Sequence, residues 1–266
     1  MLAYCGGIMS DSVDLRWLLD AWAYDADDNV RVAHGSDGRE IMQVRLPLGI
    51  EQFEMDGRPD GLRPHGHDSA FDCHLSRQSV SSQAITLSSE DCSELFAEGM
   101  LYYYRYVNLF KLKDWVRTIR DTERNLKLFD FVNHHAENQE DQHYLEQWRP
   151  YVMRMCACAR AMSELESGQF DTALKIIGAA SLEIQTLPEN EETIYAFERE
   201  RSLTALKTLA RQIEKSKPVS KLEQLEKKLR KAIATQEFEK AAILRDQIRA
   251  SRQTASPDPA DNTSST

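Results

Sequence analysis

From Ser88 almost to its end, the chain repeats apolar residues at helical spacing, and this pattern constrains the fold more than any other feature. Apolar side chains recur at i, i+3, i+4 and i+7 from Ser88 to about residue 112, and the Ser88 and Asp91 pair resembles a capping box. Eleven Gly and eight Pro make 19 of 266 residues, about 7% against the usual ~12%, so turn formers are scarce. These features predict a mainly helical protein and exclude collagen-like, β-helical and all-β folds.

Residues 10–87 carry a different pattern and predict a small β-containing region of unknown role. From Asn29, apolar and polar residues alternate in three short runs separated by turn signals, which is typical of a β-hairpin or meander. Pro47 restricts the strand before it to an edge or a bulge. Residues 56–67 hold three Gly and two Pro, which predicts an irregular loop. The expected fold class is therefore mainly α with a minor β component (α+β).

A helical body is expected over residues 88–217, with helices separated by turn signals. Residues 1–9 lack periodicity and predict a disordered leader, in which either Met1 or Met9 could start translation. Residues 253–266 are rich in Ser, Thr, Pro, Asp and Asn and predict a disordered tail.

Charge is unevenly distributed along the chain. The net charge is −10, yet eleven Lys or Arg against six acids between Glu214 and Arg252 give that segment +5 and leave −15 for the rest. A separate C-terminal module with its own partner would produce this difference, and so would a basic solvated helix face. The overall negative charge disfavours nucleic-acid binding by the whole surface.

Residues 219–252 predict two antiparallel helices joined near Thr235 to Glu237. Two helices of about fourteen residues bury little apolar surface, so the open side of the hairpin needs a partner. Phe238 at the turn is suited to anchor in a facing pocket, and adjacent alanines allow close helix approach. The residues predicted to bind the partner are Leu225, Leu229, Ile233, Phe238, Ala241, Ala242, Leu244, Arg245 and Ile248.

The sequence from Leu225 to Ile248 contains five features in a fixed order: spaced Leu residues, Ala-Ile, an acidic-Phe-Glu turn, Ala-Ala and Leu-Arg-Asp-x-Ile. This string resembles the UVR motif, a helical hairpin shared by the bacterial excision-repair subunits UvrB and UvrC and found also in the ClpC unfoldase and in McsA, an activator of a protein arginine kinase. The resemblance implies a coiled-coil-like module for protein–protein docking, with contact through the turn Phe, here Phe238. It implies no reaction.

The chain departs from all of these proteins outside the hairpin. It has no G-x-x-x-x-G-K-[ST] phosphate loop and no C-x-x-C pair, so neither ATPase chemistry nor McsA-type zinc modules are expected. We therefore predict a non-enzymatic adapter or regulator without cofactor or metal. Its partner would be a UvrB/UvrC-like subunit, a Clp ATPase or a second copy of the chain. The alternative is an accessory factor of nucleotide excision repair that contacts UvrB, UvrC or DNA.

The loop at residues 56–67 is the candidate second site. Carboxylates, imidazoles and arginines could form an enzyme site there, or, with Cys73 and His74, a metal site. The spacing matches no zinc pattern, and Asp-Gly pairs also serve turns for conformational reasons, so a surface loop is the favoured interpretation. The candidate residues are Asp56, Arg58, Asp60, Arg63, His65 and His67.

Residues 161–174 repeat the layout of residues 232–242. In each, a helix end and a polar turn precede Phe and an acid, with Ala three residues after the Phe. Both resemble the turn of a tetratricopeptide-type helix pair, so the body could be a repeat array. Unrelated helical hairpins with the same turn are the other explanation.

Three further patterns have structural explanations. Tyr103 and Tyr104 fall on the core stripe of their helix, which favours packing over base stacking. The basic residues at 227–231 could contact phosphates, but they also suit a solvated helix face. Five Cys without paired spacing predict reduced thiols, and the absence of a basic leader or a long apolar run predicts a cytoplasmic protein.

Overall fold

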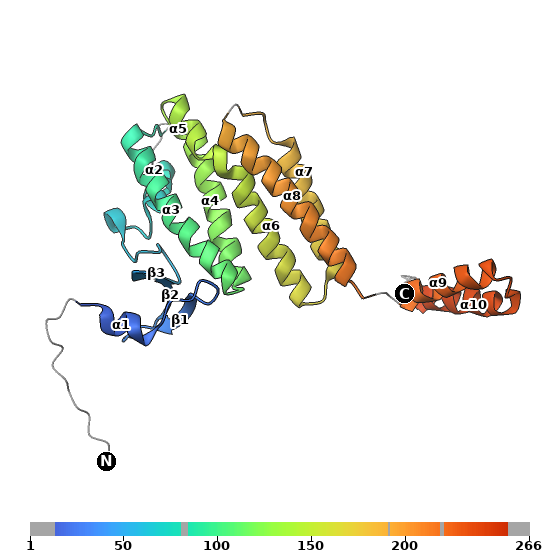
Figure 1. Cartoon of the computed structure of the whole chain (residues 1–266). Coiled ribbons are helices and arrows are strands. Elements are labelled where there is room, and N and C mark those ends of the chain that lie inside the picture. Colours follow the sequence, from blue (N-terminus) through green and yellow to red (C-terminus); the bar gives the residue numbers. More distant parts are fainter. Residues whose placement is uncertain (1–13, 81–84, 191, 219–220, 255–266) are drawn as a thin grey trace, which may run out of the picture. The chain divides into compact units, whose positions relative to one another are not determined.

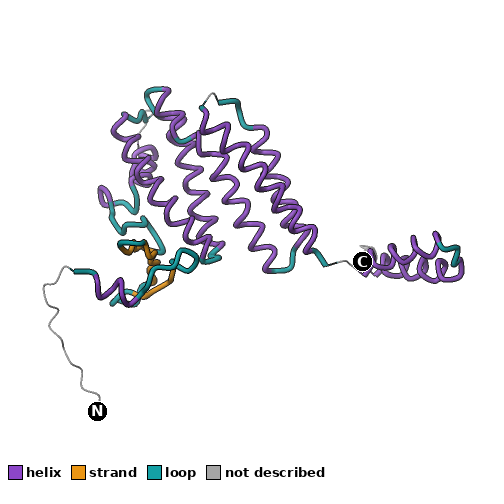
Figure 2. Tube along the Cα trace, in the orientation of Figure 1, coloured by secondary structure: helices purple, strands orange, loops and turns teal. Residues whose placement is uncertain are grey.

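The computed structural model describes residues 14–80, 85–190, 192–218 and 221–254. They form two compact units that divide between Glu214 and Lys215 (Figure 1). Helices dominate both units, and the strands are confined to the N-terminal part, as predicted (Figure 2). The predicted leader at 1–9, and the predicted tail from 255 onward, lie outside the described residues.

The predicted meander is an antiparallel three-stranded sheet in the order β1-β2-β3. Gly38 makes the first turn at φ 84°, a conformation that favours glycine. The strand before Pro47 was expected at an edge or a bulge, but it is the central strand β2, because Pro47 lies in the two-residue turn between Leu46 and Gly49 and removes no hydrogen bond from the ladder. The strands are β1 (Val30–His34), β2 (Glu40–Leu46) and β3 (Gly49–Glu54), preceded by the short helix α1 (Arg16–Ala21).

The helical body packs mostly in chain order, so that α3, α4, α6 and α7 are successive neighbours (Figure 1). Leu206 and Ile213 of α8 share a buried cluster with residues of α6 and α7. The helices are α2 (Ala70–Val80), α3 (Ser89–Lys111), α4 (Trp115–His135), α5 (Gln139–Tyr144), α6 (Arg149–Glu166), α7 (Phe170–Thr186) and α8 (Thr193–Ser216), with 3₁₀ turns η1 (Pro64–Gly66) and η2 (Glu146–Trp148).

The boundaries of α3 and α4 follow from local chemistry that the sequence displays. Ser88 and Asp91 form the predicted capping box at the start of α3. At its end, Lys113 takes φ 60°, and the amide of Asp114 donates to the carbonyl of Leu109 at 3.0 Å, as in a Schellman turn. The Asp114 carboxylate then caps α4 by accepting the amide of Arg117 at 3.0 Å.

Helix α2 lies where only strands and a loop were expected. Its start depends on a residue distant in sequence: Glu98 of α3 accepts the amides of Ala70 at 2.7 Å and Phe71 at 3.1 Å. Ser69 also accepts the amide of Asp72 at 3.0 Å, and this Ser-x-x-Asp pattern was a readable local signal.

Some expected details differ from the structure. Helix α10 continues through Thr254, into the predicted tail. The core stripe of α3 is also displaced: Tyr102 and Tyr106 are buried, whereas Tyr104 is 48% exposed.

A buried ion pair joins α3 and α4 to the end of the sheet. Arg105 and Asp121 are each 1% exposed, and two hydrogen bonds connect them, Nε to Oδ2 at 2.6 Å and Nη2 to Oδ1 at 2.9 Å. Nη1 of the same arginine donates to the carbonyls of Glu54 and Gly57, both at 2.8 Å. One guanidinium group therefore fixes the last strand on two helices.

Arg105→Ala is expected to lower the free energy of unfolding by about 3–5 kcal/mol, because Asp121 would remain charged and buried without its main partner. Urea unfolding followed by circular dichroism measures this loss. Arg160→Ala is the control, since Arg160 pairs with Glu123 at the surface, where such pairs contribute about 1 kcal/mol or less. Equal losses in the two variants would contradict the role assigned to Arg105.

Candidate interaction surface of the C-terminal hairpin

The C-terminal unit is the predicted hairpin of α9 (Lys221–Ala234) and α10 (Phe238–Thr254). Its interior is small and apolar, which agrees with the expectation that two short helices bury little surface. The side chains of residues 221–223 and 251–254 lie outside the description. The core consists of Leu225, Ala232, Ala241, Leu244 and Ile248, with Leu229 partly buried against it.

The turn between the two helices is tightly hydrogen-bonded. Gln236 has φ 57°, and the amide of Glu237 donates to the carbonyl of Ala232 at 2.8 Å, again as in a Schellman turn. The Glu237 carboxylate accepts from Thr235 Oγ1 at 2.9 Å and from Lys240 Nζ at 3.0 Å. These bonds fix where α10 starts and therefore where Phe238 is presented.

The structure divides eight of the nine predicted contact residues into two groups, and the ninth, Leu229, is partly buried against the hairpin core. Leu225, Ala241, Leu244 and Ile248 are in the hairpin core, so they hold the two helices together. The exposed group is Ile233, Phe238, Ala242 and Arg245.

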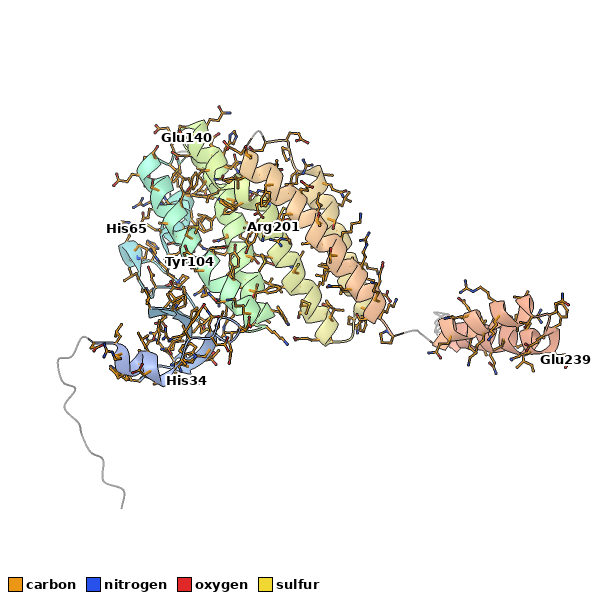
Figure 3. All side chains as sticks on the ribbon, viewed as in Figure 1. His34, His65, Tyr104, Glu140, Arg201 and Glu239 are labelled. Atoms are coloured by element: carbon orange, nitrogen blue, oxygen red, sulfur yellow. The ribbon has the colours of Figure 1, made fainter. Side chains whose placement is uncertain are left out.

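Phe238, Ala242 and Arg245 follow the spacing i, i+4 and i+7, so they share one side of α10, which we call the Phe238 face. The Phe238 side chain is 69% exposed, next to Glu239 at the turn end of the hairpin (Figure 3). Ile233 is 55% exposed just before the same turn. Ile243, which the sequence prediction omitted, is 61% exposed but lies about 100° from Ala242 around the helix.

The turn between α6 and α7 has the same backbone geometry as the turn between α9 and α10. The similarity between residues 161–174 and 232–242 therefore extends from the sequence to the backbone. Gly168 has φ 72°, and the amide of Gln169 donates to the carbonyl of Glu164 at 2.8 Å, as Glu237 does to Ala232. Phe170 begins α7 as Phe238 begins α10. A tetratricopeptide array in the helical body stays a prediction.

The two hairpins differ in what covers the helix after the turn. In α7, the positions matching the Phe238 face are Phe170, Leu174 and Ile177; the first two are partly buried and Ile177 is 1% exposed. They pack in the cluster that α8 completes with Leu206 and Ile213. The Phe238 face has no such cover from the described part of its own unit.

The loop of the candidate second site uses its charged groups to bind the loop itself to the helices. Asp56 accepts from Arg120 Nη1 of α4 at 2.5 Å, and Arg58 lies 3.0 Å from Asp60. Arg58 also reaches the buried Glu98 at 3.4 Å. The charged side chains of Asp56, Arg58 and Asp60, which were candidates for an enzyme site, are thus paired within the fold.

The other candidate residues of the loop, Arg63, His65 and His67, do not form a common site. Arg63 pairs with Asp68 at 2.6 Å, and His65 is exposed at 4.0 Å from Glu94 (Figure 3). His67 is partly buried, and its backbone amide donates to the carbonyl of Pro64 at 3.0 Å. Within the described ranges, no group of three or more His, Cys, Asp or Glu is placed to hold a metal ion.

Comparison with known proteins agrees with the predicted resemblance. The family model of the UvrB/uvrC motif matches residues 220–254, which is the C-terminal hairpin. No curated protein matches the chain, and no solved structure does. Among the described helices, none is long and apolar enough to cross a membrane.

His74, once a candidate ligand, is a buried side chain of α2 beside Phe131. Burial lowers its pKa below the usual 6.5, although Asp91 at 3.8 Å opposes this shift. As the pH falls, the unfolded chain therefore takes up a proton on His74 before the folded chain does. The contribution of His74 to stability is present above pH 6.5 and is lost as the pH falls.

We expect unfolding in urea to need less denaturant at pH 5 than at pH 7, and we expect His74→Gln to reduce that difference. The same pH dependence in His74→Gln and the wild type would contradict the role assigned to His74.

Proposed function

We propose that this protein is a non-enzymatic adapter that docks a partner protein through the Phe238 face of its C-terminal hairpin. The observation that carries the proposal is the contrast between the two hairpins of the chain. The same turn presents a phenylalanine in both, and among the described residues of each unit only Phe170 packs against a cluster to which a third helix contributes. The partner would supply the missing helix.

The residues of the Phe238 face suit this role. A 69% exposed aromatic side chain at a rigid turn is a costly feature in water, and aromatic anchors of this kind dominate the binding energy of many interfaces. Ala242 leaves room for close helix approach, and Arg245 adds a charge at the edge. The UvrB/uvrC motif mediates protein–protein interaction, which supports the same function.

Charge favours a different protein over a second copy of the hairpin. The segment from Glu214 to Arg252 carries +5, and the basic residues Lys227, Lys228, Arg230 and Lys231 are all exposed. Two such hairpins would repel each other, whereas an acidic helical surface would be attracted and would associate faster. We therefore propose an acidic helical partner in the cytoplasm, of the UvrB, UvrC or Clp ATPase type, with a homodimer as the competing outcome.

Phe238→Ala is expected to remove the partner while leaving the helices intact, because the side chain contributes to the interface and not to the hairpin core. Loss of an anchor of about 2 kcal/mol corresponds to roughly 30-fold weaker binding. The intact chain and the variant serve as baits in a lysate of the source organism, with quantitative mass spectrometry of what they retain. Far-UV circular dichroism checks the helicity.

Ile243→Ala is the matched control, since Ile243 is a similarly exposed apolar residue of α10 that lies off the Phe238 face. It should retain the partner. Equal recovery with all three baits would contradict the proposal. A dimer of the wild type that Phe238→Ala dissociates, measured by light scattering, would replace the external partner with a second copy.

A further inference from the structure

A cavity of about 550 Å³ lies inside the helical body, far in sequence from the C-terminal hairpin. Helices α3, α4, α5, α6 and α8 contribute to its wall, so it belongs entirely to the first unit. The wall is rich in aromatic and apolar residues, which is typical of sites for small molecules. The aromatic residues are Phe96, Tyr103, Tyr106, Phe129, Tyr144, Trp148 and Tyr151.

The aromatic rings are held in place by contacts with one another. Phe96 and Tyr144 stack with their ring centroids 4.5 Å apart, and Tyr103 lies 5.9 Å from Tyr151. Tyr144 is 50% exposed and Trp148 is 38% exposed, so part of the wall is open to solvent. A ligand can therefore enter without the helices separating.

One charged side chain in this wall is buried and incompletely paired. Glu198 of α8 is 5% exposed, and its Oε2 atom has no hydrogen-bond partner among the described residues. A buried acceptor without a donor costs free energy, about 1–3 kcal/mol for an uncharged group and more for a charged one. Such a group at the edge of a cavity therefore favours a ligand that carries a hydrogen-bond donor.

The neighbouring cations leave this carboxylate available. Arg201 hydrogen-bonds the other oxygen, with Nη1 3.2 Å from Oε1, and its side chain is 57% exposed (Figure 3). Arg154 of α6 lies with its guanidinium carbon 4.9 Å from the centroid of the Tyr151 ring, and its Nε has no hydrogen-bond partner in the described residues. The terminal torsion of a Glu side chain is soft, so a small rotation can turn Oε2 toward a donor in the cavity.

We propose that this cavity binds a small organic amine, with its ammonium group on Glu198 and its apolar body between the aromatic rings. An ammonium donor makes a charge-assisted hydrogen bond to a carboxylate, which is roughly twice as strong as a neutral one. Aromatic faces also attract cations, more strongly where water is excluded. This site does not depend on the Phe238 face.

Isothermal titration of the full chain with 2-phenylethylamine and with 2-phenylethanol tests the proposal, because the two probes share their size and apolar body and differ in charge. We expect the amine to bind at least tenfold more tightly than the alcohol at pH 7. Equal affinity, or no binding of the amine at millimolar concentration, would overturn the proposal without any substitution being made.

Two variants assign the preference to Glu198. Glu198→Gln keeps the shape of the side chain and removes its charge, so the tenfold preference for the amine should disappear. Glu200→Gln, on the exposed side of the same helix, should keep it. A preference that survives Glu198→Gln would overturn the assignment.

Discussion

The first unit depends on one buried arginine. Arg105 bonds Asp121 through two nitrogens and two backbone carbonyls through the third, so a single side chain connects α3, α4 and the end of β3. A buried charge is stabilised by matching its donors and acceptors, and the matching of all three Arg105 nitrogens restricts the sheet to one position. Glu98, also on α3, fixes the start of α2 by accepting the backbone amides of Ala70 and Phe71. The charged loop near Asp56 takes part in the same attachment, because Asp56 pairs with Arg120 of α4 and Arg58 reaches Glu98 of α3.

The second unit is governed by a different constraint, the small size of its core. Two helices with a core of a few small and aliphatic side chains cannot also cover an aromatic residue at their turn. Inside the first unit, the equivalent Phe170 packs against a cluster to which α8 contributes Leu206 and Ile213. After α10 the described chain provides no third helix. The proposed adapter function follows from this difference. A partner helix would pack against Phe238 as the cluster of α6, α7 and α8 packs against Phe170.

Much of the fold could be predicted from local chemistry. The capping box at Ser88, the Asp114 boundary and the hairpin turn are encoded by residues within a few positions of each other, and the structure confirms the helices that they delimit. Helix α2 was missed although Ser69 and Asp72 give a local signal for its start, and no local pattern shows that Glu98, 28 and 27 residues away, binds its first amides. Helical periodicity located the two helices of the hairpin, but it did not separate its buried residues from the exposed Phe238 and Ala242, because that division depends on how α9 packs against α10. The aromatic cavity is lined by residues from five helices, and no local sequence pattern predicts that these residues lie close together.

The central claim is that the partner covers the Phe238 face, and the reactivity of a cysteine placed on that face measures it directly. Ala242→Cys would be labelled with a maleimide in the purified chain and in its complex, with peptide-level mass spectrometry to separate this thiol from the native ones. Gln247→Cys, about 140° around α10 from Ala242, provides the comparison. The account predicts rapid labelling of both thiols in the free chain and strong protection of Ala242→Cys alone in the complex. Equal labelling of Ala242→Cys with and without the partner would contradict it.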